Sequence, residues 1–238
     1  MRALLLAAGL GMRLRPITDS IPKCLVEICD KPLLEYWLLL LNSPAIDEVF
    51  INLNYLSEKV ESFLIGRNDP YKIIKLNEDV LLGTAGTIKN SYEFFRDQPL
   101  IVIHADNLSQ FDLNLFIKAF DTRKQGIEIT MMTFLTDEPK NCGIVELDPD
   151  GLVVGFHEKS ERPYGNLANG AVYIISPGVI DFIHHSNEYI NDFSTQVIPN
   201  FVGRINTYHN AVYHRDIGTC VSLDLAQTEF KLFLSNKF

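Results

Sequence analysis

The amino-terminal run Ala3–Ala8 is apolar without interruption and is followed directly by Gly9. A short apolar run with no polar alternation is typical of a strand that is buried on both faces. Such strands belong to sheets that helices cover on both sides, so this run favours an α/β fold. A signal peptide can begin in a similar way, but this run is short, and Arg13 and Arg15 follow it closely. We therefore interpret the run as a buried first strand.

The first half of the chain continues as alternating strands and helices. Apolar periodicity and turn residues predict strands at 48–53, 73–76 and 100–104, and helices at 32–41, 57–65, 84–95 and 113–123. Asp30 is the expected N-cap of the first of these helices, and Thr84 that of the third. The alternation predicts right-handed crossovers and a largely parallel sheet.

The second half shows a different pattern. Strands are expected at 127–135, 144–147, 152–157 and 171–175, a strand or strand pair at 205–214, and helices at 177–184, 194–202 and 219–234. The Asp-Pro-Asp-Gly sequence at 148–151 predicts a turn that closes a hairpin. We find no internal repeat and no linker, so the sequence predicts one domain, 1–238, with a small antiparallel lobe.

Composition excludes several classes of protein. The 238 residues include 21 basic and 30 acidic side chains, and the net charge of −9 disfavours nonspecific binding to nucleic acid. No apolar run approaches the roughly 18 residues that a membrane-spanning helix needs. The four cysteines contain no C-x-x-C pair, so we expect reduced thiols in a cytoplasmic protein rather than disulfides or a zinc site.

A glycine-rich loop follows the first strand. Gly9 and Gly11 allow the backbone to approach a ligand and to present its N–H groups. The loop lacks the third glycine of a dinucleotide-binding fingerprint and the G-K-[ST] of a P-loop. Arg13 and Lys23 lie nearby, and residues 1–25 contain four basic side chains against one acidic side chain. Backbone donors beside a cluster of cations predict a polyphosphate site. A tight turn with solvated arginines is the alternative.

Two aspartates are candidate metal ligands. Asp106 follows the apolar strand at 100–104, and the carboxyl ends of parallel strands are where ligand-binding groups gather. Asp216 lies in an Arg-Asp-Ile-Gly-Thr segment. One or two carboxylate oxygens, completed by phosphate oxygens, suit Mg²⁺, so we expect this cofactor. The alternatives are a helix cap for Asp106 and a turn residue for Asp216.

Three early segments resemble the motifs of the sugar-1-phosphate nucleotidyltransferases in order and spacing: Gly9-Leu-Gly-Met-Arg13, Pro22-Lys-Cys-Leu25 and Lys31-Pro-Leu33. Later segments fall where that family has further motifs, namely 82–86, 104–107, 142–143, 157–159, 168–171 and 215–219. The resemblance implies a Rossmann-like, GT-A-like α/β domain with a mixed, largely parallel sheet. It also implies a nucleotide-binding part at about 1–125 and a small antiparallel sugar-phosphate-binding lobe within about 126–238. We expect no C-terminal β-helix domain.

The resemblance also implies roles for individual residues. The implied catalytic residues are Arg13 and Lys23, and the implied metal ligands are Asp106 and Asp216. The implied nucleotide-binding residues are Leu6, Ala8, Gly9, Gly11, Met12, Arg13, Gly83, Thr84, Ala85 and Asp106. The implied sugar-phosphate-binding residues are Gly143, Glu158, Lys159, Asn169 and Gly170. A solvated ion pair at a strand end is the alternative for Glu158 and Lys159.

The loop at 82–86 bears on the choice of base. Relatives that use UTP or dTTP often carry a glutamine near this loop, and none occurs between Leu76 and Ser91. The sequence therefore resembles the mannose-1-phosphate guanylyltransferase-like branch. We expect GTP and mannose 1-phosphate or a heptose 1-phosphate as substrates, with release of pyrophosphate.

Alternatives to this assignment stay open. A UTP- or dTTP-dependent enzyme acting on a hexose 1-phosphate or an N-acetylated sugar 1-phosphate is one of them. A GT-A glycosyltransferase would use a D-x-D acid pair, and Ala105-Asp106-Asn107 lacks the second aspartate. A non-catalytic sensor of nucleotide sugars is the third. We expect small-molecule partners, no nucleic acid and no membrane, and a homodimer stays open.

Overall fold

The computed structural model describes residues 1–161 and 164–235, and it separates into two compact units. Unit 1 comprises residues 1–4, 82–103 and 111–212, and unit 2 comprises residues 5–81, 104–110 and the segment that begins at Tyr213. Each unit is therefore assembled from segments that are distant in the sequence. Within the described residues, no helix is both long and apolar enough to cross a membrane.

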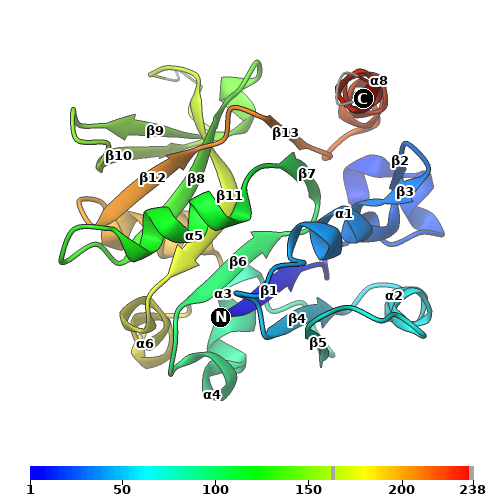
Figure 1. Cartoon of the computed structure of the whole chain (residues 1–238), viewed down its shortest axis with the longest axis horizontal. Coiled ribbons are helices and arrows are strands. Elements are labelled where there is room, and N and C mark those ends of the chain that lie inside the picture. Colours follow the sequence, from blue (N-terminus) through cyan, green and yellow to red (C-terminus); the bar gives the residue numbers. More distant parts are fainter. Residues whose placement is uncertain (162–163, 236–238) are drawn as a thin grey trace. The chain divides into compact units, whose positions relative to one another are not determined.

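Unit 2 is built on parallel strands that carry the glycine-rich loop. Strand β1 (Arg2–Leu6) ends in this unit, next to β4 (Glu48–Leu53), and β4 pairs in parallel with β5 (Lys72–Asn77) (Figure 1). Its helices are α1 (Leu33–Leu40), α2 (Ser57–Leu64) and α8 (Cys220–Ser235). Three short 3₁₀ helices follow the loop: η1 (Met12–Leu14), η2 (Ile17–Asp19) and η3 (Lys23–Leu25).

Two small antiparallel sheets complete unit 2. Strands β2 (Glu27–Ile28) and β3 (Lys31–Pro32) form a tight hairpin. Strands β7 (Asn107–Gln110) and β13 (Tyr213–Asp216) pair so that Asp216 lies opposite Asn107. This second pairing brings the end of one strand next to the start of another that lies more than a hundred residues away in the sequence.

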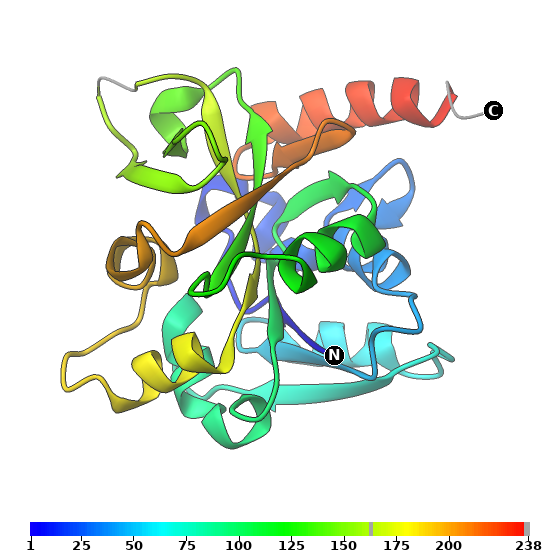
Figure 2. The ribbon, with the colours of Figure 1, turned by 60° about the vertical axis from the view of Figure 1, so that its left-hand side comes forward.

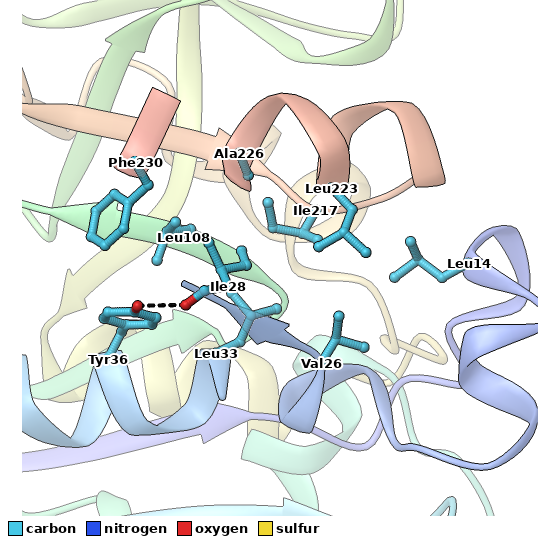
Figure 3. Close-up of a cluster of buried hydrophobic side chains, with 10 residues drawn as sticks. All are labelled: Leu14, Val26, Ile28, Leu33, Tyr36, Leu108, Ile217, Leu223, Ala226 and Phe230. Atoms are coloured by element: carbon cyan, nitrogen blue, oxygen red, sulfur yellow. Dashed lines mark hydrogen bonds between the residues drawn. The ribbon is translucent and has the colours of Figure 1, made fainter. Parts of the chain in front are cut away.

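A buried apolar cluster holds these parts of unit 2 together (Figure 3). Leu223, Ala226 and Phe230 project from one face of α8 into the cluster. The Tyr36 ring meets the Phe230 ring edge-on at 5.1 Å, and the Tyr36 hydroxyl donates a hydrogen bond of 2.6 Å to the Ile28 carbonyl. The remaining members are Leu14, Val26, Leu33, Leu108 and Ile217. The cluster thus fixes α8 and β13 against the segment that follows the glycine-rich loop.

Unit 1 contains a mainly antiparallel set of strands. These are β6 (Leu100–His104), β8 (Ile129–Leu135), β9 (Gly143–Leu147), β10 (Val153–Glu158), β11 (Leu167–Ile175) and β12 (Ile205–His209). The order is β10-β9-β11-β6, and β8 pairs with β11 on one side. On its other side β8 pairs in parallel with β12, the orange strand that crosses the green β8 in the view of Figure 2.

The helices of unit 1 are short. They are α3 (Thr84–Asn90), α4 (Tyr92–Phe95), α5 (Leu113–Asp121), α6 (Pro177–His185) and α7 (Phe193–Gln196), with 3₁₀ helices η4 (Pro139–Asn141) and η5 (Ile198–Phe201). The N-cap of α5 is Asp112, whose side chain accepts hydrogen bonds from the backbone of Asn114 and Leu115. Such a cap satisfies N–H groups that a helix start leaves without partners.

The α/β fold with a small antiparallel lobe that the sequence predicts is confirmed, and four local predictions are corrected. The helix predicted at 84–95 is interrupted at Ser91, where α3 ends and α4 begins. The helix predicted at 194–202 is divided into α7 and η5, because Pro199 cannot donate the N–H that a continuous helix needs. Asp30 lies in the β2–β3 turn with φ +61°, so it does not cap α1. The N-cap of α3 is Gly83 rather than Thr84.

Candidate active site

The start of the glycine-rich loop is held by a buried asparagine at the end of β4. Asn52 Oδ1 accepts hydrogen bonds from the backbone N–H groups of Ala7, at 2.6 Å, and Ala8, at 3.2 Å. Its Nδ2 donates to Glu78 Oε1 at 3.0 Å, and both side chains are buried. Ala8 is one of the nucleotide-binding residues that the resemblance implies, and in the structure its N–H is engaged with Asn52. The Leu6 carbonyl likewise accepts from the Ala105 N–H.

The end of the loop requires glycine at position 11. Gly11 has φ +62°, and a Cβ there would lie 2.8 Å from Thr18 Cγ2 and 3.2 Å from Lys23 Cβ. The Thr18 hydroxyl donates to the Gly11 carbonyl at 2.7 Å, and the Tyr55 hydroxyl donates to the Thr18 carbonyl. A Cβ on Gly9, by contrast, would meet no atom within 4 Å. The loop is thus fixed at both ends and open in its middle, which suits the approach of a ligand.

Lys23 lies between the two candidate metal ligands. Its Nζ donates to Asp106 Oδ2 at 2.7 Å and lies 3.9 Å from Asp216 Oδ1. The β7–β13 pairing and a hydrogen bond from the Ile217 N–H to the Asp106 carbonyl bring the two acids together. Lys23 itself is 6% exposed, so its charge is screened little by water.

The charge of Lys23 acts on Asp106. Partial burial alone would raise the pKa of the Asp106 carboxyl, but the neighbouring Lys23 ammonium and His104 outweigh burial and lower this pKa. The carboxylate is therefore ionised at neutral pH. Asp106 precedes strand β7 rather than a helix, and Asp216 is the last residue of β13, so neither the helix cap nor the turn alternative describes them.

The Arg13 guanidinium also lies near Asp216, next to Gly218. A Cβ on Gly218 would lie 2.7 Å from Asp216 Oδ2 and 2.8 Å from a terminal nitrogen of Arg13. Gly218 therefore leaves the space in which the Asp216 carboxylate and the Arg13 guanidinium approach each other. The structure thus brings four predicted residues of unit 2 into one cluster: Arg13, Lys23, Asp106 and Asp216. Met12 is exposed beside them.

We expect Gly218→Ala to reduce kcat/KM by about 100-fold, because displacing catalytic groups by about 1 Å costs that much. The new methyl group would displace Asp216, Arg13 or both. Steady-state kinetics and the melting temperature check this expectation. Gly165→Ala is the matched control, since a Cβ there meets nothing within 4 Å and the backbone is not left-handed. An unchanged kcat/KM for Gly218→Ala would show that the acid and the guanidinium tolerate displacement.

The two carboxylates fit a shared Mg²⁺ site rather than a cage made by the protein alone. Both approach the same ammonium group, so they face one point. No group of three or more His, Cys, Asp or Glu side chains within the described ranges could enclose a metal ion. Mg²⁺ is commonly held by one or two carboxylates together with substrate phosphates, and two carboxylates are what this cluster offers.

The loop at 83–85 belongs to unit 1, where it is bound to the segment before α7. Gly83 has φ +80°, and a Cβ there would lie 2.4 Å from the Asn191 carbonyl oxygen. The Ala85 N–H donates to that carbonyl at 3.0 Å, and the Thr84 hydroxyl accepts from the Phe193 N–H at 2.7 Å. These hydrogen bonds hold the loop in place. Glycine is required at position 83 because the Asn191 carbonyl lies where a Cβ would be.

The predicted sugar-phosphate residues are gathered on β9, β10 and β11, with Lys159 directly after the end of β10. Gly143 lies opposite Glu158 in the hairpin, and a Cβ on Gly143 would lie 2.7 Å from Glu158 Oε2. Lys159 Nζ lies 3.6 Å from Glu158 Oε1, and the lysine side chain is 67% exposed. Asn169 and Gly170 lie where the register of β11 against β8 shifts. Lys159 is thus an exposed cation paired with Glu158 at the end of β10, which is also the arrangement that the alternative of a solvated ion pair describes.

Two residues that the sequence did not indicate, Tyr173 and Asp192, lie next to Asn169 and Glu158. Asn169 Nδ2 donates to the buried Tyr173 hydroxyl at 2.6 Å, and the Tyr173 ring packs on Phe193 at 4.8 Å. Burial raises the pKa of the Glu158 carboxyl, Asp192 raises it further, and Lys159 opposes both. Neither Tyr173 nor Asp192 lies in a recognisable motif, and only the strand pairing and the loop before α7 connect them with Glu158.

A glycine-rich loop fixed at both ends, a buried lysine and two facing carboxylates thus lie together in unit 2, an arrangement that suits a phosphorylated ligand and a divalent cation. Residues 2–231 match the family model described as nucleotidyl transferase. The chain belongs to this family, which confirms the resemblance found in the sequence.

Three similar proteins bear on the substrates. A UTP–glucose-1-phosphate uridylyltransferase from Synechocystis is 33% identical over 218 residues, covering 85% of this chain and 55% of that protein. Mannose-1-phosphate guanylyltransferase 1 from Arabidopsis thaliana is 33% identical over 189 residues, covering 77% and 52%. The structure of HddC from Yersinia pseudotuberculosis with GMP-PN has a TM-score of 0.78 and 26% identity, covering 96% of this chain and 99% of that chain. The chain spans about half the length of the curated relatives it matches.

Proposed function

We propose that this chain transfers a nucleotidyl group from a nucleoside triphosphate to a sugar 1-phosphate. An oxygen of the sugar phosphate attacks the α-phosphorus, the bond from that phosphorus to the bridging oxygen of the β-phosphate breaks, and pyrophosphate leaves. The observation that carries the proposal is the position of Lys23 between Asp106 and Asp216, next to a glycine loop and Arg13. Positioning and charge neutralisation dominate phosphoryl-type transfer, and these groups supply both.

Each residue of the cluster has a distinct part in this proposal. Arg13 carries an exposed, permanently charged guanidinium, which suits the triphosphate. Lys23 is a buried point charge that faces the reacting phosphates and holds the two carboxylates in place. Asp106 and Asp216 would hold Mg²⁺, which when bound neutralises charge on the phosphate oxygens.

The groups on β9, β10 and β11 suit the sugar phosphate. The Glu158 carboxylate can accept hydrogen bonds from neighbouring sugar hydroxyls, and the absence of a side chain on Gly143 leaves room next to it. Lys159 offers a mobile charge for the phosphate of that sugar. Asn169 can donate and accept, although its Oδ1 already accepts from the Ala171 N–H.

We expect Lys159→Ala to raise the KM for the sugar 1-phosphate by about tenfold, with little change in the KM for the triphosphate, because its charge faces one substrate. The two KM values, each measured at saturating co-substrate, check this. Lys140→Ala, which removes another exposed lysine of unit 1, is the control. Equal effects on both KM values would place Lys159 in a phosphate site shared by the two substrates.

We further propose guanine as the base and mannose 1-phosphate or a heptose 1-phosphate as the acceptor. Support comes from the absence of glutamine between Leu76 and Ser91, from the guanylyltransferase relative and from the similar structure in complex with GMP-PN. The uridylyltransferase relative is equally identical in sequence, so UTP with a hexose 1-phosphate is the alternative that an assay must separate.

A competition assay tests both the proposed transfer reaction and the proposed substrates. GTP, UTP, dTTP, CTP and ATP are offered together with a panel of hexose and heptose 1-phosphates and Mg²⁺, and pyrophosphate and the nucleotide sugars are measured. We expect pyrophosphate release with GTP preferred. A preference for UTP or dTTP refutes guanine alone. No release with any pair refutes the transfer reaction and favours a binding protein, and products formed from a nucleotide sugar rather than a triphosphate favour a glycosyltransferase.

A further inference from the structure

Helix α8 has an apolar face on each side. Its inward face carries Leu223 and Phe230, which pack into the cluster of Figure 3. Its outward face carries Val221, Leu225 and Leu232, which are 68%, 40% and 60% exposed. A surface helix normally presents polar side chains to water. The outward face of α8 is therefore unusual, because three large apolar side chains on it are in contact with water.

The outward residues follow the spacing of a helix–helix seam. Val221, Leu225, Thr228 and Leu232 are separated by steps of four, three and four residues, and all four are exposed. This is the alternation of a and d positions in a heptad, which places the side chains on one stripe along the helix. We call these four residues the α8 seam. The helix of 16 residues extends for about 24 Å, which is enough for such a seam to pack against another helix.

We propose that the α8 seam binds the same seam of a second copy of this chain, with the two helices antiparallel about a two-fold axis. A two-fold axis makes the surface self-complementary, which is the commonest symmetry of soluble dimers. In this arrangement Val221 of one copy faces Leu232 of the other, and Leu225 faces Thr228. Val221, Leu225 and Leu232 of each copy then pack against the seam of the other copy.

Charge on the edge of the seam selects the antiparallel direction. Asp224 and Lys231 are exposed, seven residues apart on the same edge. Neither makes an ion pair within the part of the chain that the structure describes. The antiparallel pair places Asp224 of each copy beside Lys231 of the other, so two ion pairs form. A parallel pair would place Asp224 beside Glu229, another acid, whose carboxylate is already paired with Arg215, so no ion pair would form there.

The surface next to the seam has room for a side chain. A hollow of about 620 Å³ lies between α8 and the β2–β3 turn, and Thr228, Lys231 and Leu232 line its side toward the seam. In the antiparallel pair this is where Val221 of the second copy is placed. A single pair of short helices buries less than the roughly 1,200–2,000 Å² of a standard interface. We therefore expect a reversible dimer, with a Kd in about the micromolar range.

Sedimentation velocity over a wide range of protein concentration measures the association. The unaltered chain should pass from monomer to dimer, and Leu225→Glu and Leu232→Glu should each raise the Kd by tenfold or more. Leu115→Glu, at a leucine of α5 that is 53% exposed, is the matched control and should leave the Kd unchanged. Thermal melting confirms that each variant folds. A monomer at every concentration, or a dimer that Leu225→Glu does not weaken, overturns the proposal.

A charge exchange tests the direction of the pair. Asp224→Lys should weaken the dimer because two lysines then meet, and Asp224→Lys combined with Lys231→Asp should restore it. If the helices were parallel, the lysine of Asp224→Lys would instead meet Glu229 and would not weaken the dimer, and that result would overturn the antiparallel arrangement. None of these residues belongs to the nucleotidyl-transfer cluster, so the outcome is independent of the proposed reaction.

Discussion

Replacing Asp106 or Asp216 with alanine is expected to lower kcat by at least about 100- to 1,000-fold, the range lost when one preorganised electrostatic group is removed from an active site. Both carboxylates face the Lys23 ammonium, at 2.7 Å and 3.9 Å, and each would contribute one of the oxygens that hold Mg²⁺. Steady-state kinetics at saturating Mg²⁺ and triphosphate measure the loss. A kcat near that of the unaltered chain for either variant would remove that residue from the site.

The two substitutions should differ in their effect on stability. A carboxylate at a ligand site usually contributes little to core packing, so the sequence alone predicts that the melting temperature of either alanine variant barely falls or even rises. The structure leads to a different prediction for Asp106, because Asp106→Ala leaves the ammonium of buried Lys23 without its nearest counter-charge. Asp106→Ala should therefore melt at a lower temperature than Asp216→Ala. Asp106→Asn keeps an acceptor for Lys23 and should melt closer to the unaltered chain.

Matched measurements separate loss of the site from loss of the fold. Asp121→Ala removes an exposed acid of α5 and should change neither kcat nor the melting temperature. The dissociation constant for Mg²⁺, measured in the presence of a non-hydrolysable triphosphate, should increase for both site variants. If kcat falls while Mg²⁺ binding is unchanged, the acids act on the substrates directly rather than through the metal.

The parts of the site that sequence could predict are those with a local signal. Gly11, Arg13 and Lys23 lie within a few residues of one strand, and two glycines followed by cations can be recognised without a structure. Asp106 was found because it follows a strand, whose position apolar residues reveal. Strand positions were predicted well for the same reason, and 48–53 and 100–104 agree with β4 and β6.

The parts that sequence could not predict depend on contacts between distant segments. Asn52 contacts Ala7 across 45 residues, and Asn191 fixes Gly83 through a backbone carbonyl, so neither side-chain type nor spacing reveals them. Helix α8 is a further case. Its periodicity predicts a helix at 219–234, but apolar residues occur on both faces, and only packing shows that Leu223 is inward and Leu225 outward.

The replacement Asn52→Asp is expected to destabilise unit 2 by about 2–4 kcal/mol and to raise the KM for the triphosphate severalfold. Aspartate can still accept the Ala7 and Ala8 N–H groups. It replaces the Nδ2 donor, however, with an oxygen about as far from Glu78 Oε1 as the present 3.0 Å. Two carboxylates then meet where both side chains are buried, and their repulsion moves the start of the glycine-rich loop. Thermal melting and steady-state kinetics measure both effects.

A reciprocal exchange provides the control for this prediction. Glu78→Gln alone keeps an acceptor for Asn52 Nδ2 and should be close to neutral. Combined with Asn52→Asp, it supplies a donor to the new carboxylate, so the hydrogen bond reforms with its direction reversed and the loop regains its support. The double variant should therefore recover both the melting temperature and the KM for the triphosphate. Recovery of the melting temperature without recovery of the KM would show that the pair stabilises the unit but does not position the loop. No recovery of either would contradict the hydrogen-bonding arrangement itself.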